Sequence, residues 1–260
     1  MNLPPARIDY IIEKLRECTR ALLDNFDDDE IEEEARGSSP DLLADALFHL
    51  LDVLKQLECL DHVDCPSFDA HAYPGTYPRL ENTEEISELA DYGIHLLRDL
   101  SSWANRLNLQ DACSEIEVLS LSLALWTSER GGEVRTLEPL VNGFAFLANR
   151  TRDPNELEQL FNATGKVIHS VAIEVSDAED DSFARPWRIL VINRAIVATR
   201  TRRPALMREA FDDLVEQLPD DAPAFFREGM EQMDLVGYPD RVKEVMAHYA
   251  NLWSAERILH

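Results

Sequence analysis

Apolar residues recur along the whole chain at steps of three and four positions, which is the spacing of one face of an α-helix. No stretch alternates apolar and polar residues with the β-branched enrichment expected of a half-buried strand. Glycine and proline fall mainly between the periodic segments, where they mark helix ends. The pattern therefore predicts an all-α protein of nine or ten helices. We expect them at about 5–26, 40–60, 83 to a break near 105–110, 111–128, 135–150, 154–174, 184–202, 204–218, 222–236 and 238–260.

The helix expected at 184–202 is the most apolar of the set. Its middle carries the run Ile189–Ile192, followed by Ala195–Ala198. A helix that is apolar on most sides is usually buried on most sides. We therefore expect this helix to lie at the centre of its part of the fold.

A short motif, Ala-x-Arg-Thr-Arg-x-Pro, occurs at Ala148–Pro154 and again fifty positions later at Ala198–Pro204. Each copy closes one predicted helix and precedes another, and a weaker copy starts at Ala104. Arginine is favoured near the carbonyl end of a helix, so the motif suits a turn inside a helical hairpin. Units of this size bury their apolar faces by stacking on one another. The sequence thus predicts successive antiparallel helical hairpins.

This layout resembles tetratricopeptide-type and related α-solenoid arrays over about residues 83–236. The residues that define the tetratricopeptide repeat at fixed positions are not found there. We expect an N-terminal part, 1–82, holding a helical pair, an acidic linker and a proline-rich loop. A helical-hairpin array would follow over 83–260, and the two parts can also form one continuous domain.

Acidic residues outnumber basic ones by 50 to 25, which gives a net charge of −25. Residues 1–100 hold 24 of the acids and 8 bases, with a dense acidic run between Asp24 and Glu34. We interpret that run as a solvated linker, with an acidic hook for a basic partner as the alternative. The charge disfavours direct binding to nucleic acid. No apolar run is long enough to span a bilayer and no secretory signal precedes the first helix, so we expect a cytoplasmic location and no membrane partner.

One segment has the composition of a zinc site. Cys59, His62 and Cys65 follow C-x2-H-x2-C spacing, and His71 comes six residues later. Thiolate and imidazole are the ligands that Zn²⁺ takes in tetrahedral sites. The second short chelating turn that is usual in such sites is missing, so incidental loop residues are the preferred interpretation and no cofactor is predicted.

Three carboxylate–histidine pairs have the i,i+4 spacing that places both side chains on one helix face. Di-metal sites in helical bundles use Glu-x-x-His, an i,i+3 spacing that is not present in these pairs. Local side-chain pairing is therefore preferred over a di-metal site. The pairs are Asp45/His49, Asp91/His95 and Glu244/His248.

The C-terminal part of the chain carries the one basic cluster in the sequence. It can hold a phosphate or an acidic peptide, or it can pair with the acidic N-terminal half of the same chain, which we prefer. Its members are Arg194, Arg200, Arg202, Arg203 and Arg208, with Arg185 and Arg188 upstream.

No sequence signature of catalysis is present: the chain has no G-x-S-x-G, no phosphate-binding P-loop and no G-x-G-x-x-G. The leading hypothesis is a non-enzymatic interaction, adaptor or regulatory protein with a basic or amphipathic protein partner. One alternative is a metal-dependent enzyme or sensor that uses zinc or a di-metal site. The other is an acidic nucleic-acid mimic that binds a DNA-binding protein.

Overall fold

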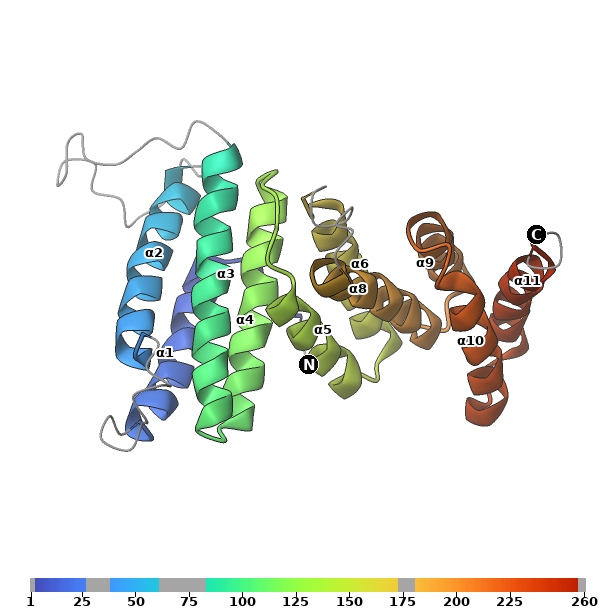
Figure 1. Cartoon of the computed structure of the whole chain (residues 1–260), viewed down its shortest axis with the longest axis horizontal. Coiled ribbons are helices and arrows are strands. Elements are labelled where there is room, and N and C mark those ends of the chain that lie inside the picture. Colours follow the sequence, from blue (N-terminus) through green and yellow to red (C-terminus); the bar gives the residue numbers. More distant parts are fainter. Residues whose placement is uncertain (1–2, 27–37, 61–82, 173–180, 257–260) are drawn as a thin grey trace. The chain divides into compact units, whose positions relative to one another are not determined.

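The computed structural model describes residues 3–26, 38–60, 83–172 and 181–256. Within these ranges the chain is all-helical, and its one β-type contact is an isolated bridge between Val134 and Val171. The prediction of an all-α fold is confirmed. Figure 1 labels the ten helices, which are α1 (Ile8–Asp24), α2 (Pro40–Leu60), α3 (Thr83–Arg106), α4 (Gln110–Glu129), α5 (Glu138–Arg150), α6 (Pro154–His169), α8 (Asp181–Arg200), α9 (Pro204–Gln217), α10 (Ala222–Val236) and α11 (Asp240–Glu256).

The chain forms two compact units. We call Pro4–Leu147, together with His169–Ala172, the N-terminal unit. We call Ala148–Ile168, together with Ile173–His260, the C-terminal unit. The sequence analysis placed a boundary at 82/83 and kept one continuous domain as the alternative. The helices on both sides of that division pack together, because the apolar stripes of α1 and α2 are covered by α3 and α4.

A closed ring of four helices forms the core of the N-terminal unit. In this ring α1 packs on α2, α2 on α3, α3 on α4 and α4 back on α1, with neighbours running in opposite directions (Figure 1). This is the arrangement of a four-helix bundle, in which the apolar stripe of every helix faces one shared interior. Leu15, Leu47, Leu97 and Trp126 are fully buried in it.

Helix pairs form the C-terminal unit. Helix α8 packs on α9, α10 packs on α11, and α9 also contacts α11. Aromatic rings fill the space between the last three helices. The ring of Phe211 lies 5.2 Å from both Phe226 and Tyr249, centroid to centroid, at steep interplanar angles. Edge-to-face contacts of this kind fix the helices as well as burying apolar area.

Both copies of the repeated motif lie where the hairpin prediction put them. Helix α5 ends at Arg150 and α6 starts at Pro154, while α8 ends at Arg200 and α9 starts at Pro204. The two turns also contact each other. The Arg200 guanidinium donates to the carbonyl oxygens of Ala148 and Thr151, at 2.7 Å each. Since the last carbonyls of a helix have no partner inside the helix, the arginine of the second copy caps the helix of the first.

Two local expectations are corrected. The first helix begins at Ile8, after both prolines, and so Pro5 is not its first residue. Helix α8 is not buried on all sides, because Ile189 and Ile196 are 36% and 43% exposed. None of the described helices combines the length and apolar character needed to cross a membrane.

Candidate functional site

Most of the predicted zinc segment lies outside the described residues. Cys59 is in the last turn of α2, and its side chain is not described, while His62, Cys65 and His71 fall within 61–82. The zinc alternative therefore stays a hypothesis, beside the preferred interpretation of incidental loop residues. Elsewhere, the described residues contain no group of three or more His, Cys, Asp or Glu side chains placed to hold a metal ion.

The Asp91/His95 pair has a structural role, because both side chains contact Thr136. Asp91 Oδ1 accepts a hydrogen bond of 2.8 Å from the backbone N–H of Thr136, and His95 Nε2 lies 3.1 Å from the Thr136 hydroxyl. Both side chains therefore tie the segment before α5 to helix α3. The members of the other two pairs lie on exposed helix faces: Asp45 and His49 on α2, Glu244 and His248 on α11.

Arg194 is buried, with 4% exposure. Its guanidinium contacts Asp213 at 2.5 Å and Glu209 at 2.6 Å, and it lies 3.9 Å from the centroid of the Phe161 ring. Gly165 makes room for it, since a Cβ at that position would come within 3.0 Å of Arg194 Nη2. Arg194 thus joins α6, α8 and α9 through charge and packing together.

The rest of the arginine cluster divides into paired and exposed members. Arg203 contacts Glu158 and Asn155, and Arg200 caps α5. Arg202 and Arg208 are exposed, and the Arg202 guanidinium lies 5.8 Å from the Tyr238 ring centroid. Arg188, upstream of these residues, pairs with Asp221 at 2.8 Å. The described carboxylates that contact the cluster therefore belong to the C-terminal unit: Glu158, Glu209, Asp213 and Asp221.

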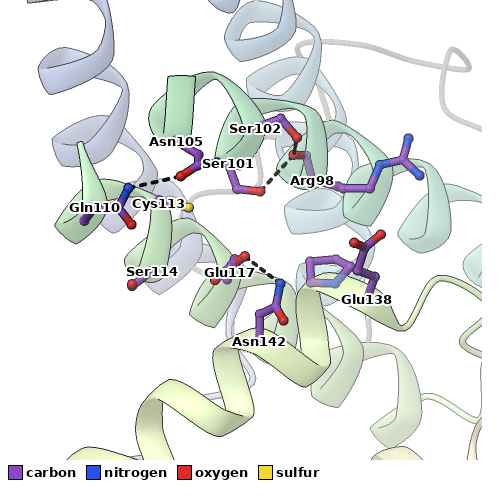
Figure 2. A pocket seen from close by; sticks show the side chains of 11 residues that line it. Arg98, Ser101, Ser102, Asn105, Gln110, Cys113, Ser114, Glu117, Glu138 and Asn142 are labelled. Carbon is purple, nitrogen blue, oxygen red and sulfur yellow. Dashed lines mark hydrogen bonds between the residues drawn. The ribbon is translucent and has the colours of Figure 1, made fainter. Parts of the chain in front are cut away.

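A polar pocket of about 360 Å³ opens between α3, α4 and α5 in the N-terminal unit. Figure 2 shows its side chains converging from the three helices, with Glu117 and Asn142 joined across it by a hydrogen bond of 2.8 Å. The lining residues are Arg98, Ser101, Ser102, Asn105, Gln110, Cys113, Ser114, Glu117, Glu138, Pro139 and Asn142.

Burial sets the chemistry of this polar pocket. It raises the pKa of Glu117, the Asn142 hydrogen bond acts in the opposite direction, and the charge of Glu138 raises the pKa further. Burial also raises the pKa of the Cys113 thiol, with Glu117 adding to the effect. Cys113 is therefore a protonated thiol near neutral pH, which argues against a nucleophilic role.

Close packing at one glycine positions the Glu117–Asn142 pair. A Cβ on Gly143 would lie 2.5 Å from the backbone oxygen of Glu117. Helix α5 can therefore approach the backbone of α4 directly at this point, and the adjacent residue, Asn142, reaches the Glu117 carboxylate. Glycine inside a helix costs about 1 kcal/mol relative to alanine, so close helix contact is the physical reason for it here.

An apolar groove of about 320 Å³ lies in the C-terminal unit, between α8 and α10, with Met246 of α11 and Tyr238 completing its wall. Ile196 and Val236 line it and are 43% and 56% exposed. Gly229 admits Met246, because a Cβ there would lie 2.7 Å from the Met246 sulfur. The lining residues are Ile192, Ile196, Thr199, Arg200, Phe225, Glu228, Gly229, Gln232, Met233, Val236, Tyr238 and Met246.

Acidic side chains stand beside this groove on α10. Glu228 is part of the lining, its side chain is 71% exposed, and its carboxylate lies 3.9 Å from the exposed guanidinium of Arg227. Glu231 is exposed one turn further along the helix. Asp234 is 79% exposed and pairs with Lys243 at 3.2 Å. The groove therefore combines an apolar interior with negative charge on one edge.

Comparisons with protein-family models, with curated proteins and with solved structures find no match to this chain. The polar pocket and the apolar groove were both missed by the sequence analysis. Two signals in the sequence point toward them. Gly143 and Gly229 stand inside predicted helices, where an isolated glycine often marks close packing. Ile192 and Ile196, which line the groove, have helical spacing on a helix whose other face is already apolar.

Proposed function

We propose that this protein is an interaction protein whose C-terminal unit binds an amphipathic, basic helix of a protein partner. The observation that carries the proposal is the apolar groove between α8 and α10, lined by the partly exposed side chains of Ile196 and Val236 over the buried side chains of Met233 and Met246. Exposed apolar side chains that gather in a hollow with polar edges are typical of interaction sites, whereas singly scattered ones are not.

Apolar burial supplies the driving force. Fully burying a valine or isoleucine side chain contributes about 1.5–3 kcal/mol. Ile196 and Val236 each keep about half of their surface exposed, so a partner that covers both gains roughly 2 kcal/mol from them alone. Ile192 and Phe225 are half-buried in the same groove and add to this gain.

The shape of the groove favours a helical ligand. Two helices form its long sides, and a groove between helices accepts side chains spaced at i, i+3, i+4 and i+7 on one face of a third helix. Met233 and Met246 lie in the groove, and their unbranched side chains adapt to ligand side chains of different shape.

Charge selects between basic and acidic ligands. Glu228 and Glu231 are exposed along α10, and the one arginine in the lining, Arg200, donates its hydrogen bonds to the carbonyl oxygens of Ala148 and Thr151. Lysine or arginine on the polar face of a docked helix would meet this acidic edge. An acidic helix would be repelled by it, so complementarity gives specificity as well as faster association.

Fluorescence anisotropy tests the proposal with a labelled amphipathic peptide of leucine and lysine, about 18 residues or five helical turns long. We expect the parent protein to bind it at 0.15 M salt, where long-range attraction is screened. Ile196→Asp should weaken binding tenfold or more, roughly 1.4 kcal/mol or above, because it places a carboxylate in the apolar groove.

Leu252→Asp is the matched control. Leu252 is 52% exposed on α11 of the same unit and does not line the groove, and the substitution makes the same change in charge. We expect it to leave the affinity within about twofold, since rim and remote surface positions contribute little. Equal weakening by the two variants, or equal binding of a leucine–glutamate peptide, would refute the proposed groove.

A further inference from the structure

We infer that the polar pocket of the N-terminal unit is a binding site for a guanidinium group. This site is separate from the apolar groove, lies in the other unit, and takes a ligand of different chemistry. Its walls come from α3, α4 and α5, and its volume of about 360 Å³ holds a guanidinium together with an alkyl stem.

The pocket is rich in hydrogen-bond acceptors. Asn142 Nδ2 donates a hydrogen bond to Glu117 Oε1. Glu117 Oε2 and the side-chain oxygen of Asn142 are left to accept hydrogen bonds from a ligand. Gln110 is oriented in the same way, because its Nε2 donates to Asn105 Oδ1 at 3.0 Å and leaves its carbonyl oxygen available. The exposed carboxylate of Glu138 stands at the edge.

The pocket's own cation is engaged elsewhere. The Arg98 guanidinium contacts Asp99 through Nε and Nη2, at 3.2 and 3.1 Å, and in Figure 2 it extends away from Glu117 and Asn142. Among the described residues, no basic side chain forms an ion pair with Glu117 or Glu138. Two carboxylates that act on each other thus share one pocket whose lining arginine, Arg98, contacts Asp99 instead, and partial burial of Glu117 adds to the cost of its charge.

Guanidinium fits this acceptor set better than ammonium does. It is planar, presents five N–H donors in a fixed fork, and is more weakly hydrated, so it can bridge a carboxylate and neighbouring amide carbonyls in one plane. Its charge would relieve the repulsion between Glu117 and Glu138. The Gly143 contact and the Asn142 hydrogen bond fix Glu117 before any ligand arrives, which lowers the cost of ordering the site.

The test uses isothermal titration calorimetry on the full chain with three probes: butylguanidinium, N-acetyl-arginine amide and butylammonium. We expect both guanidinium probes to bind and butylammonium to bind at least about fivefold more weakly. Tighter binding of the arginine amide identifies an arginine side chain of a peptide as the ligand. Equal or tighter binding of butylguanidinium identifies a small molecule.

Glu117→Gln keeps the shape of the side chain and an oxygen that accepts from Asn142. It should lower the affinity for both guanidinium probes about tenfold or more, because it removes a charge-assisted hydrogen bond. Glu115→Gln is the matched control, because Glu115 lies on the same helix but acts on Tyr10 and Cys18 instead. It should change affinity less than twofold. If circular dichroism shows that Glu117→Gln is unfolded, the same titrations are done with Glu138→Gln, which changes an exposed position. No binding by the parent at probe concentrations on the order of 10 mM, or equal losses in Glu115→Gln and Glu117→Gln, would overturn the inference.

Discussion

Arg194 offers a sharp test of whether the arginine cluster is structural. Arg194→Met keeps the length of the aliphatic stem and removes the guanidinium. The variant loses the contacts to Asp213 and Glu209 and the cation–π contact with Phe161. Because Arg194 itself is only 4% exposed, the change acts inside the C-terminal unit.

The size of the loss follows from the burial of each partner. Hydrogen bonds to charged groups contribute about 1.5–3 kcal/mol each, and a desolvated cation–π contact contributes about 2 kcal/mol. The two carboxylates are 31% and 54% exposed, so water replaces part of what they lose, and methionine recovers some apolar packing. We therefore expect the free energy of unfolding to fall by about 3 kcal/mol, at the lower end of values for breaking a buried ion pair.

Urea unfolding followed by circular dichroism gives the magnitude, and native-state hydrogen exchange of α6, α8 and α9 shows whether the loss lies in the C-terminal unit. Arg208→Met is the control, because Arg208 is exposed and the charge change is the same. We expect that control to stay within about 0.5 kcal/mol of the parent. A loss below about 1 kcal/mol for Arg194→Met, or equal losses for both variants, would refute a structural role for Arg194.

Three further outcomes follow from the packing. Arg200→Met should lower the free energy of unfolding by about 1–3 kcal/mol and speed hydrogen exchange at the end of α5, because it leaves the Ala148 and Thr151 carbonyls without their side-chain donor; unchanged exchange there would contradict the cap. Gly143→Ala should cost at least about 2 kcal/mol in urea unfolding, since its Cβ would lie 2.5 Å from a backbone oxygen; a neutral or stabilising result would disprove the close approach. Glu117→Gln should stabilise the protein by about 0.5 kcal/mol at pH 7. The pKa of Glu117 in the folded protein lies above its ordinary value of 4.5, so ionisation of Glu117 destabilises the fold once the pH exceeds 4.5. The advantage of Gln should therefore vanish as the pH falls below 4.5, and a gain in stability that persists at low pH would rule out this cause.

Helix positions were predictable because they depend on local features. Three predicted helix starts, at Pro40, Pro154 and Pro204, coincide with those in the structure, because proline at the first helical position loses no hydrogen bond and already has a helical φ angle. Pro5 fails as a start because the apolar face that packs in the bundle begins only at Ile8. Local signals therefore locate a helix, and tertiary burial decides how far it extends.

The sites depended on contacts that sequence order does not reveal. Glu117 and Asn142 are 25 positions apart and meet only because α5 crosses α4 at Gly143. The arginines were recognised as a cluster from sequence, but their partners were not. The pattern shows charges of both signs in the C-terminal part, yet only the packing of α6, α8 and α9 brings Arg194 to Asp213 and Arg203 to Glu158.

Helix α8 shows why the groove escaped prediction. Hydrophobic periodicity measures how apolar a helix is, but it cannot tell whether a neighbouring helix covers each face. The surplus apolar residues of α8 therefore predicted a central helix. In the structure, α9 covers one face, and Ile196 on another remains partly exposed beside α10.

The most direct test of the central claim is hydrogen exchange, followed by mass spectrometry, with and without the leucine–lysine helix at saturating concentration. Docking in the groove predicts slower exchange in peptides from α8 and α10, while peptides from the α1–α4 bundle keep their rates. Protection spread evenly over both units, or confined to the acidic N-terminal part, would contradict the groove and leave only charge attraction to explain the binding.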